Sequence, residues 1–243
     1  MTKTYEIVID GKTCTAQHGE FLWDVAKRNG IEIPALCRSD AFADHRACCR
    51  VCIVEVITRG RSKVVTSCVY PVESPCEVLT NSPKIAQERK VLMALLEARA
   101  PESDSIKEMA AAMGANEGYS RLKPLDAGKC ILCGLCVQAC ESMGTGAIST
   151  VNRGTEKEIN TPYGAASEAC IGCLSCANVC PTGSIEFTED AETRTIWNRT
   201  FQLVKCKECG AILGTDAMNM GDTCDICRKK AIADSLAQTY RFV

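Results

Sequence analysis

The chain has 243 residues, a formal net charge of −2 and a sequence pI near 5.8. This charge argues against a nucleic-acid partner, because nucleic-acid-binding proteins usually carry a basic footprint. Aromatic residues make up only 5 % of the chain, whereas 19 residues are cysteine. Small modules that gain folding free energy from bound metal fit this composition better than one large aromatic core.

The sequence shows no secretory signal at its start and no apolar run near the length of about 18 residues that spans a bilayer. We therefore expect a cytoplasmic protein without a membrane span. Cysteines stay reduced in the cytoplasm, so we interpret most of them as metal ligands rather than disulfides.

The first 80 residues have the pattern of a small β-rich domain. The expected elements are a strand at 3–10, a returning strand at 12–16, a helix at 21–29 and strands at 53–57 and 64–67. Asp10-Gly11 is a hairpin turn signal, and Asn29-Gly30 is a fitting end for the helix. This order, with a cysteine-rich loop between helix and third strand, predicts a β-grasp domain over residues 1–80.

The rest of the chain alternates helical and cysteine-rich segments. Residues 81–127 form an expected helical linker, which Pro101 divides into two helices. The remaining expected elements are a helix at 103–113, a loop at 116–129, strands at 195–198 and 201–204, and a closing helix at 229–239. The overall prediction is an α+β protein of several small modules.

Two four-cysteine runs fill the module predicted over residues 128–192. Each has C-x2-C-x2-C-x3-C spacing, the bacterial ferredoxin pattern for two [4Fe–4S] clusters, in which the fourth cysteine of each run ligates the other cluster. The predicted ligand sets are therefore Cys130, Cys133, Cys136 and Cys180 for one cluster, and Cys170, Cys173, Cys176 and Cys140 for the other. A pair of zinc sites is the alternative, and the repetition of this spacing disfavours it.

A four-cysteine tail lies in the module predicted over residues 193–243. Its ligand candidates, spaced C-x2-C-x14-C-x2-C, are Cys206, Cys209, Cys224 and Cys227. Two such knuckles bring four thiolates into a tetrahedron, and the spacing matches a zinc ribbon. Iron in a rubredoxin-type site or a further iron–sulfur cluster stays open, because both also use thiolates. A zinc ion has no redox change, so a zinc module would brace or dock a partner instead of carrying electrons.

The N-terminal loop offers a third ligand set, spaced C-x11-C-x2-C-x15-C. Its members are Cys37, Cys49, Cys52 and Cys68. A long loop with one ligand, a close pair and a distant fourth suits a [2Fe–2S] cluster at the edge of a β-grasp domain. A zinc site or unrelated buried cysteines are the alternatives. Cys14 and Cys76 match no ligand position, and we expect both to be buried as small hydrophobic residues.

Several segments resemble one family. The strings IPALC, ACCRVCIVEV and TSCVYPV, with the run from Cys130 to Glu141, resemble the large iron–sulfur subunit of NADH:quinone oxidoreductase. They are equally similar to diaphorase subunits of NAD(P)-linked hydrogenases and formate dehydrogenases, over about residues 3–187. That family usually has one cysteine before the arginine, which favours Cys49 over Cys48 as a ligand, whereas loop length favours Cys48. We take Cys49.

The resemblance implies a function in electron transfer. Between Cys76 and Cys130 the chain has no cysteine or histidine, so we expect it to lack the histidine-ligated cluster that this family generally carries there. We expect a subunit without its own substrate site, relaying single electrons through one [2Fe–2S] and two [4Fe–4S] clusters. Its expected partners are a flavin- and NAD(P)-binding subunit and a further redox subunit, linked to hydrogen, formate or ferredoxin. A free-standing ferredoxin and an iron–sulfur sensor are the alternatives.

Overall fold

The computed structural model describes residues 3–42, 45–115 and 128–239. The chain divides into two compact units. The first unit comprises Met1–Leu135 with Val179–Ser184, and the second comprises Cys136–Asn178 with Ile185–Val243. Most of the loop expected at 116–129 lies outside the described residues. No helix in the described ranges is both long and apolar enough to cross a bilayer.

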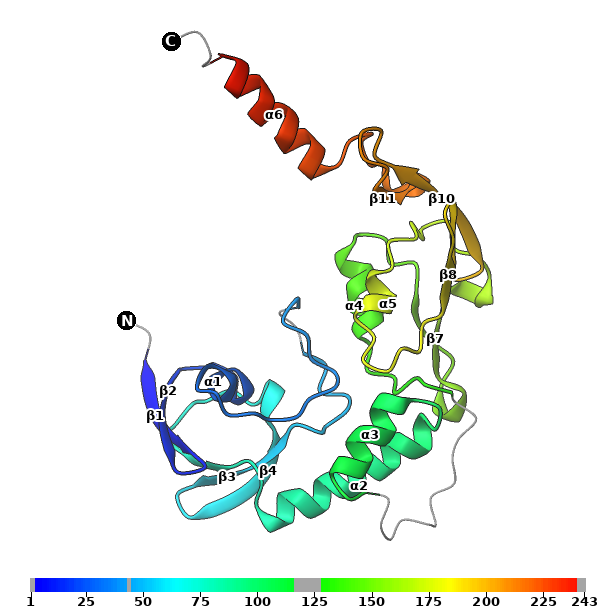
Figure 1. Cartoon of the computed structure of the whole chain (residues 1–243). Helices are drawn as coiled ribbons and strands as arrows, with labels where there is room; N and C mark the ends of the chain where they lie inside the picture. The colour runs from blue at the N-terminus through cyan, green and yellow to red at the C-terminus, as the bar shows by residue number, and fades with distance from the viewer. Residues whose placement is uncertain (1–2, 43–44, 116–127, 240–243) are drawn as a thin grey trace. The chain divides into compact units, whose positions relative to one another are not determined.

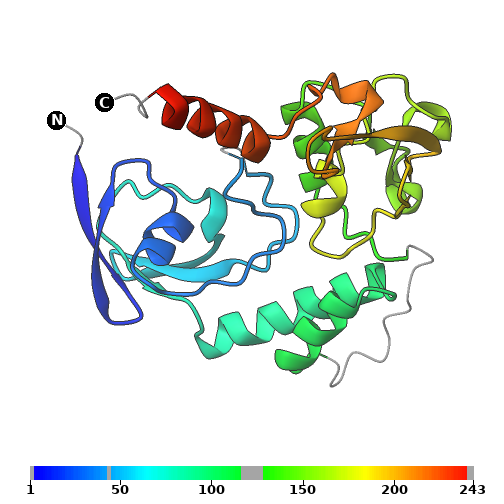
Figure 2. The same ribbon diagram turned by 45° about the horizontal axis from the view of Figure 1, so that its top comes forward.

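The first unit contains a mixed five-stranded sheet in the order β2-β1-β5-β3-β4 (Figure 1). The strands are β1 (Thr4–Ile9), β2 (Lys12–Gln17), β3 (Ile53–Thr58), β4 (Arg61–Thr66) and β5 (Glu77–Leu79). β5 runs parallel to β1, and the other pairs are antiparallel. Helix α1 (Leu22–Arg28) lies across one face of this sheet (Figure 2). The predicted α+β class is confirmed.

The alternation of apolar residues explains the core of this sheet. Ile7 and Ile9 on β1 are almost fully buried, and so are Val54 and Val56 on β3. Successive strand side chains point to opposite faces, so one face of each strand packs against α1. Asp10 and Gly11 both have positive φ (48° and 80°), as a two-residue hairpin turn requires.

Two helices follow the sheet, α2 (Pro83–Arg99) and α3 (Asp104–Ala112), and they lie side by side (Figure 1). The Ser82 side chain accepts a hydrogen bond from the amide of Ile85, and proline at the start of α2 is preset for a helix. The break expected near Pro101 is confirmed. Three buried side chains of this pair, Met93, Ile106 and Ala110, belong to a second apolar core of the first unit.

A buried arginine fastens α2 to the sheet. Arg89 is 6 % exposed, and its guanidinium donates to the carbonyls of Val51 at 3.0 Å, Ile53 at 2.8 Å and Thr80 at 3.1 Å. Burial lowers the pKa of this guanidinium. The three carbonyls depend on this one side chain for those bonds, so Arg89 fixes the start of β3 relative to the helices.

We expect Arg89→Met to lower the free energy of unfolding of the first unit by about 3 kcal/mol, because it leaves three buried carbonyls without these donors. The measurement is the urea midpoint of the far-UV circular dichroism signal. Lys84→Met, at an exposed position of α2, is the matched control. Equal midpoints for the two variants would contradict the fastening role of Arg89.

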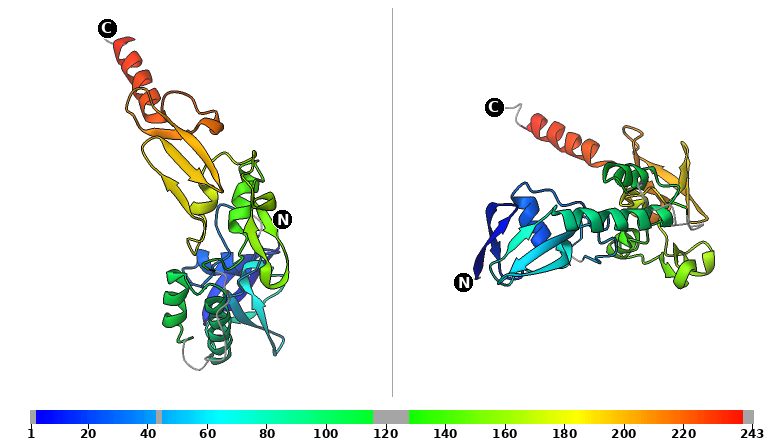
Figure 3. Two further views of the ribbon diagram at one scale, coloured as in Figure 1. Left: turned by 90° about the vertical axis from the view of Figure 1, so that its right-hand side faces the viewer. Right: turned by 90° about the horizontal axis from the view of Figure 1, so that it is seen from below.

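The second unit contains a four-stranded antiparallel sheet in the order β11-β10-β9-β8. Its strands are β8 (Phe187–Glu189), β9 (Thr193–Ile196), β10 (Arg199–Lys205) and β11 (Ile212–Thr215). The other elements are α4 (Leu135–Ser142, from the end of the first unit), α5 (Ser175–Asn178), the hairpin β6 (Ser149–Val151) and β7 (Glu158–Asn160), and α6 (Asp225–Thr239). Helix α6 extends away from the four-stranded sheet (Figure 3).

Four predictions of the elements were wrong or incomplete. The strand expected to reach Asn198 ends at Ile196, because Trp197 and Asn198 have positive φ (51° and 59°) and form the β9–β10 turn. β4 begins three residues before the expected start, in an exposed stretch without apolar alternation. α6 begins at Asp225, four residues before the expected start, and this acidic residue suits a helix N-terminus. The short strands β5, β6, β7, β8 and β11 were not anticipated.

Candidate metal centres

The N-terminal loop brings four cysteines together as two pairs. All four are buried: Cys37, Cys49, Cys52 and Cys68. The amide of Cys49 donates to Sγ of Cys37 at 3.5 Å. A hydrogen bond from the Cys37 thiol lowers the pKa of Cys49 to about 6, and one from the Cys68 thiol lowers that of Cys52 to about 7. The pKa values of Cys37 and Cys68 rise in return. Two adjoining thiol pairs can hold two iron ions.

The neighbouring Cys48 has a different environment. Cys48 is exposed, and its Sγ lies 3.6 Å from the carbonyl oxygen of Arg46. Cys49 is 4 % exposed and belongs to the second apolar core. The geometry therefore favours Cys49 as the partner of Cys37 and leaves Cys48 outside the set.

The first four-cysteine run is divided between the two units, with Cys130 and Cys133 in the first and Cys136 and Cys140 in the second. The amide of Leu132 donates to Sγ of Cys130 at 3.4 Å. Burial, together with the nearby Cys180 and Cys130 thiols, raises the pKa of Cys133 to about 11. Cys180 belongs to the short segment that joins the first unit, as crossed ligation requires. Cys136 is buried in the first turn of α4.

The second four-cysteine set surrounds one cavity in the second unit. This cavity is lined by Cys140, Cys170, Cys173 and Cys176, together with Ile148 and Trp197. Cys140 comes from the first run and the other three come from the second run, so the set is the crossed one. The amide of Ala147 donates to Sγ of Cys140 at 3.1 Å. Such amide donors stabilise a thiolate, which is the form that binds metal.

Side chains from the four-stranded sheet hold the loop that carries Cys170 and Cys173. Arg199 on β10 donates to the carbonyl of Cys170 at 2.8 Å, and Arg194 on β9 donates to that of Gly172 at 2.7 Å. The Thr215 hydroxyl donates to the carbonyl of Ile171. The C=O and N–H of a trans peptide point in opposite directions. A side chain that holds one of these carbonyls therefore directs the N–H of the same peptide unit away from itself.

These supporting residues could not be found from the sequence. Arg194, Arg199 and Thr215 act on backbone carbonyls more than 20 residues away, and no local pattern signals such contacts. Gly172 has a φ of +66°, which glycine adopts more readily than other residues. Phe201 also excludes a larger residue at this position, because a Cβ at Gly172 would lie 2.7 Å from Cδ2 of the Phe201 ring.

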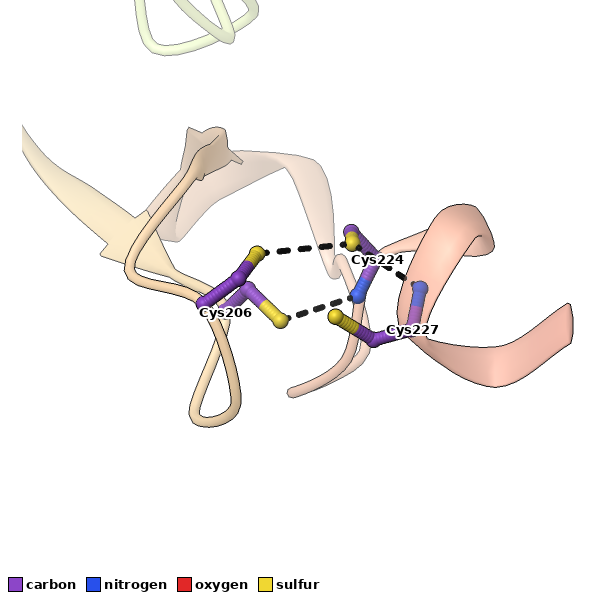
Figure 4. Close-up of side chains that lie close together, drawn as sticks. Cys206, Cys224 and Cys227 are labelled. Atoms are coloured by element: carbon purple, nitrogen blue, oxygen red, sulfur yellow. Dashed lines mark hydrogen bonds between the residues drawn. The ribbon is translucent and has the colours of Figure 1, made fainter. Parts of the chain in front are cut away.

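The four cysteines of the tail converge on one point. The Sγ atoms of Cys206, Cys209, Cys224 and Cys227 all lie within 4.8 Å of one another. Figure 4 shows Cys206, Cys224 and Cys227 close together. The amide of Cys224 donates to Sγ of Cys206 at 3.3 Å, and that of Cys227 donates to Sγ of Cys224 at 3.4 Å. Backbone donors from Cys224 and Cys209 lower the pKa of Cys206 to about 6. The arrangement can hold a single metal ion with four thiolates.

The two cysteines outside these sets differ in burial. Cys14 is 2 % exposed and belongs to the core between the sheet and α1, as expected. Cys76 is only partly buried and packs against the same core. Its pKa is raised by burial.

Two families match the chain. Residues 2–83 match the family described as 2Fe-2S iron-sulfur cluster binding domain, and residues 129–184 match the 4Fe-4S dicluster domain. These ranges contain the N-terminal loop cysteines and both four-cysteine runs, and end before the four-cysteine tail.

Curated relatives extend the match across most of the chain. The HndD subunit of the NADP-reducing hydrogenase of Solidesulfovibrio fructosivorans is 31 % identical over 210 residues, which is 74 % of this chain and 35 % of the relative. The 75 kDa subunit of the NADH-ubiquinone oxidoreductase of Reclinomonas americana is 26 % identical over 215 residues, 79 % of this chain and 30 % of the relative. The chain thus spans about a third of the length of these relatives.

This chain is also similar to a shorter relative and to a chain of a solved structure. The gamma chain of the NAD-reducing hydrogenase HoxS of Cupriavidus necator is 37 % identical over 94 residues, 37 % of each chain. A chain of the NAD+-reducing [NiFe]-hydrogenase crystal structure, H2-reduced, has a TM-score of 0.60 and 23 % identity, covering 74 % of this chain and 85 % of that one. The chain therefore carries a [2Fe–2S] cluster-binding domain and a [4Fe–4S] dicluster domain, and it is homologous to subunits of NAD(P)-linked hydrogenases and oxidoreductases.

Proposed function

We propose that this chain is the electron-transfer subunit of a multisubunit cytoplasmic oxidoreductase. It relays single electrons between a flavin- and NAD(P)-binding partner and a further redox subunit, through one [2Fe–2S] and two [4Fe–4S] clusters. The observation that carries the proposal is the crossed set of four cysteines around one cavity, since a dicluster ferredoxin needs this arrangement. The names of the relatives supply the class of partner.

The proposed ligands are the sets predicted from cysteine spacing, and the grouping of cysteines in the N-terminal loop and around the cavity of the second unit supports them. Two irons would be held by the two thiol pairs of the N-terminal loop. One [4Fe–4S] cluster would use Cys130, Cys133, Cys136 and Cys180, and the other would use Cys140, Cys170, Cys173 and Cys176. The clusters supply reversible one-electron chemistry when bound. The protein's own contribution is to bury the thiolates, donate backbone hydrogen bonds to them and exclude water.

The second apolar core supports a direct route between two centres. Cys37 and Cys49 of the N-terminal loop share this core with Cys133 of the first four-cysteine run. Leu36, Val51, Ile131 and Leu135 pack in the same core. Electrons can therefore pass from the [2Fe–2S] centre to the first [4Fe–4S] centre through packed apolar side chains, without the histidine-ligated cluster that the family generally has.

We also propose four modules, with the tail as a zinc site. The modules are the β-grasp domain at 1–80, the helical linker at 81–127, the dicluster domain at 128–192 and a zinc-ribbon-like module at 193–243. Four Sγ atoms within 4.8 Å of one another, with a backbone donor to Cys206, together with the zinc-ribbon spacing support this assignment. Because zinc does not change its redox state, this module would brace the dicluster domain or dock a partner.

Gly172 gives a test of the second [4Fe–4S] site. We expect Gly172→Ala to lose about four irons per chain, because the new methyl group collides with Phe201 beside the ligand loop. Gly154→Ala is the matched control, since Gly154 also has positive φ (64°) but meets nothing within 4 Å. Iron and sulfide analysis after anaerobic purification checks the prediction, and equal iron contents in the two variants would contradict it.

The partner proposal is tested by purification from the native source under anaerobic conditions. A tagged chain should retain a flavoprotein that oxidises or forms NAD(P)H, and NAD(P)H should reduce the clusters only when this partner is present. A chain that stays monomeric at physiological concentration and retains no partner would instead support the free-standing ferredoxin. Binding to DNA or RNA would support the sensor.

A further inference from the structure

The turn between β9 and β10 places a tryptophan at the second cluster cavity. Trp197 lines this cavity together with Cys140, Cys170, Cys173 and Cys176. Its φ is +51°, a conformation that costs energy in a bulky residue and persists only where the surroundings impose it. This turn is a candidate for function because its backbone is strained and because it borders the cavity of the second four-cysteine set.

Neighbouring contacts hold this turn in place. The Asn198 side-chain amide donates to the carbonyl of Gly164 at 3.2 Å. Arg199 donates to the carbonyls of Ser167, Glu168 and Cys170, and its guanidinium lies over the Phe201 ring at 4.8 Å from the centroid. The two residues that follow Trp197 therefore anchor the turn that carries its indole.

The indole nitrogen of Trp197 is buried and, among the described residues, meets no acceptor with hydrogen-bond geometry. An indole N–H can only donate. Buried donors without a partner are rare in folded proteins, and each one calls for an explanation such as an absent ion or group. The cavity that Trp197 lines is surrounded by cysteine sulfur atoms, which can accept such a bond.

We propose that the Trp197 indole donates a hydrogen bond to a sulfur atom of the [4Fe–4S] cluster in this cavity and raises its reduction potential. The proposal rests on the function proposed above. Reduction adds negative charge to the cluster, so a fixed donor stabilises the reduced form more than the oxidised form. The β9–β10 hairpin thereby acts as a positioning device that sets the potential of one [4Fe–4S] cluster separately from the other.

The first experiment compares Trp197→Phe with the wild-type chain in an anaerobic redox titration followed by EPR. The variant keeps an aromatic ring and removes the donor. We expect one of the two [4Fe–4S] signals to become harder to reduce, with its reduction constant three- to tenfold lower; tenfold corresponds to about 59 mV for one electron. The other signals should not move.

The chain provides a matched control in its second tryptophan. The Trp23 indole donates to the carbonyl of Ile33 at 3.0 Å, in the first unit. Trp23→Phe also removes one indole N–H, and we expect it to leave both [4Fe–4S] potentials unchanged. A shift of the same size in this control would assign the effect to general loosening and overturn the proposal.

A second measurement leaves Trp197 intact. In the Trp23→Phe chain, Trp197 is the sole tryptophan, so indole-¹⁵N labelling marks this residue alone. Pulsed EPR of the reduced protein should show a ¹⁵N coupling and an exchangeable proton coupling to one [4Fe–4S] cluster. Absence of both couplings, with full iron and sulfide content, would overturn the hydrogen bond and leave the proposed function intact. A wild-type chain without [4Fe–4S] clusters would instead defeat the function.

Discussion

Cys49→Ser is expected to abolish the [2Fe–2S] centre, whereas Cys48→Ser should retain it. Cys49 is buried and its backbone amide and thiol both contact Cys37, so serine there removes one ligand from the pair. Cys48 is exposed, and its sulfur lies against the backbone of Arg46. We expect Cys49→Ser to contain about two fewer irons and two fewer sulfides per chain than the wild type.

The measurement is iron and acid-labile sulfide analysis together with EPR of the reduced protein. The [2Fe–2S] signal should disappear in Cys49→Ser and keep its intensity in Cys48→Ser, while both variants keep the [4Fe–4S] signals. The reverse pattern would make Cys48 the ligand, as loop length alone suggests. Loss of the signal in both variants would show that the loop tolerates neither change and would contradict the assignment.

Cys224→Ser is expected to empty the metal site of the tail and to loosen the segment from Cys206 onward. Sγ of Cys224 lies 3.7 Å from Sγ of Cys209, and its backbone amide donates to Cys206. Structural zinc contributes roughly 10–16 kcal/mol of apparent binding free energy in small zinc-finger peptides, which a short hairpin and an exposed helix cannot replace. We expect one zinc per chain to be lost and the iron content to stay at about ten.

Two readouts check this prediction. Metal analysis should show the loss of zinc, and hydrogen exchange should show faster exchange in β11 and α6. The exposed Cys48→Ser serves as the control for loss of a thiol as such. Loss of iron in place of zinc from Cys224→Ser would assign the tail to the electron-transfer path and contradict the bracing role.

Much of the fold could be predicted because its signals are local. The Asp10-Gly11 turn, the apolar alternation of β1 and the break near Pro101 each depend on neighbouring residues, and all three appear in the structure. β5 escaped prediction because three residues are too few to show a period of two, and its pairing with β1 joins segments about 70 residues apart.

The cysteine groups that the structure brings together in the N-terminal loop, around the cavity of the second unit and in the tail could be predicted, because cysteine spacing is visible in the sequence. The arginines that hold the surrounding backbone could not be predicted from the sequence. Arg89, Arg194 and Arg199 look like ordinary surface arginines in the sequence, yet each donates to backbone carbonyls that only the tertiary fold brings near. Trp197 was expected inside the strand at 195–198. Aromatic side chains do favour strands, but here the residue lies in the β9–β10 turn with a positive φ.

The central claim is that three thiolate-held iron–sulfur clusters lie within this chain. Its most direct test is metal and acid-labile sulfide analysis of anaerobically isolated protein, combined with EPR after reduction. We predict about ten irons, about ten sulfides and one zinc per chain, with one [2Fe–2S] and two [4Fe–4S] signals. Colourless protein that contains zinc at the paired four-cysteine runs and no acid-labile sulfide would contradict it.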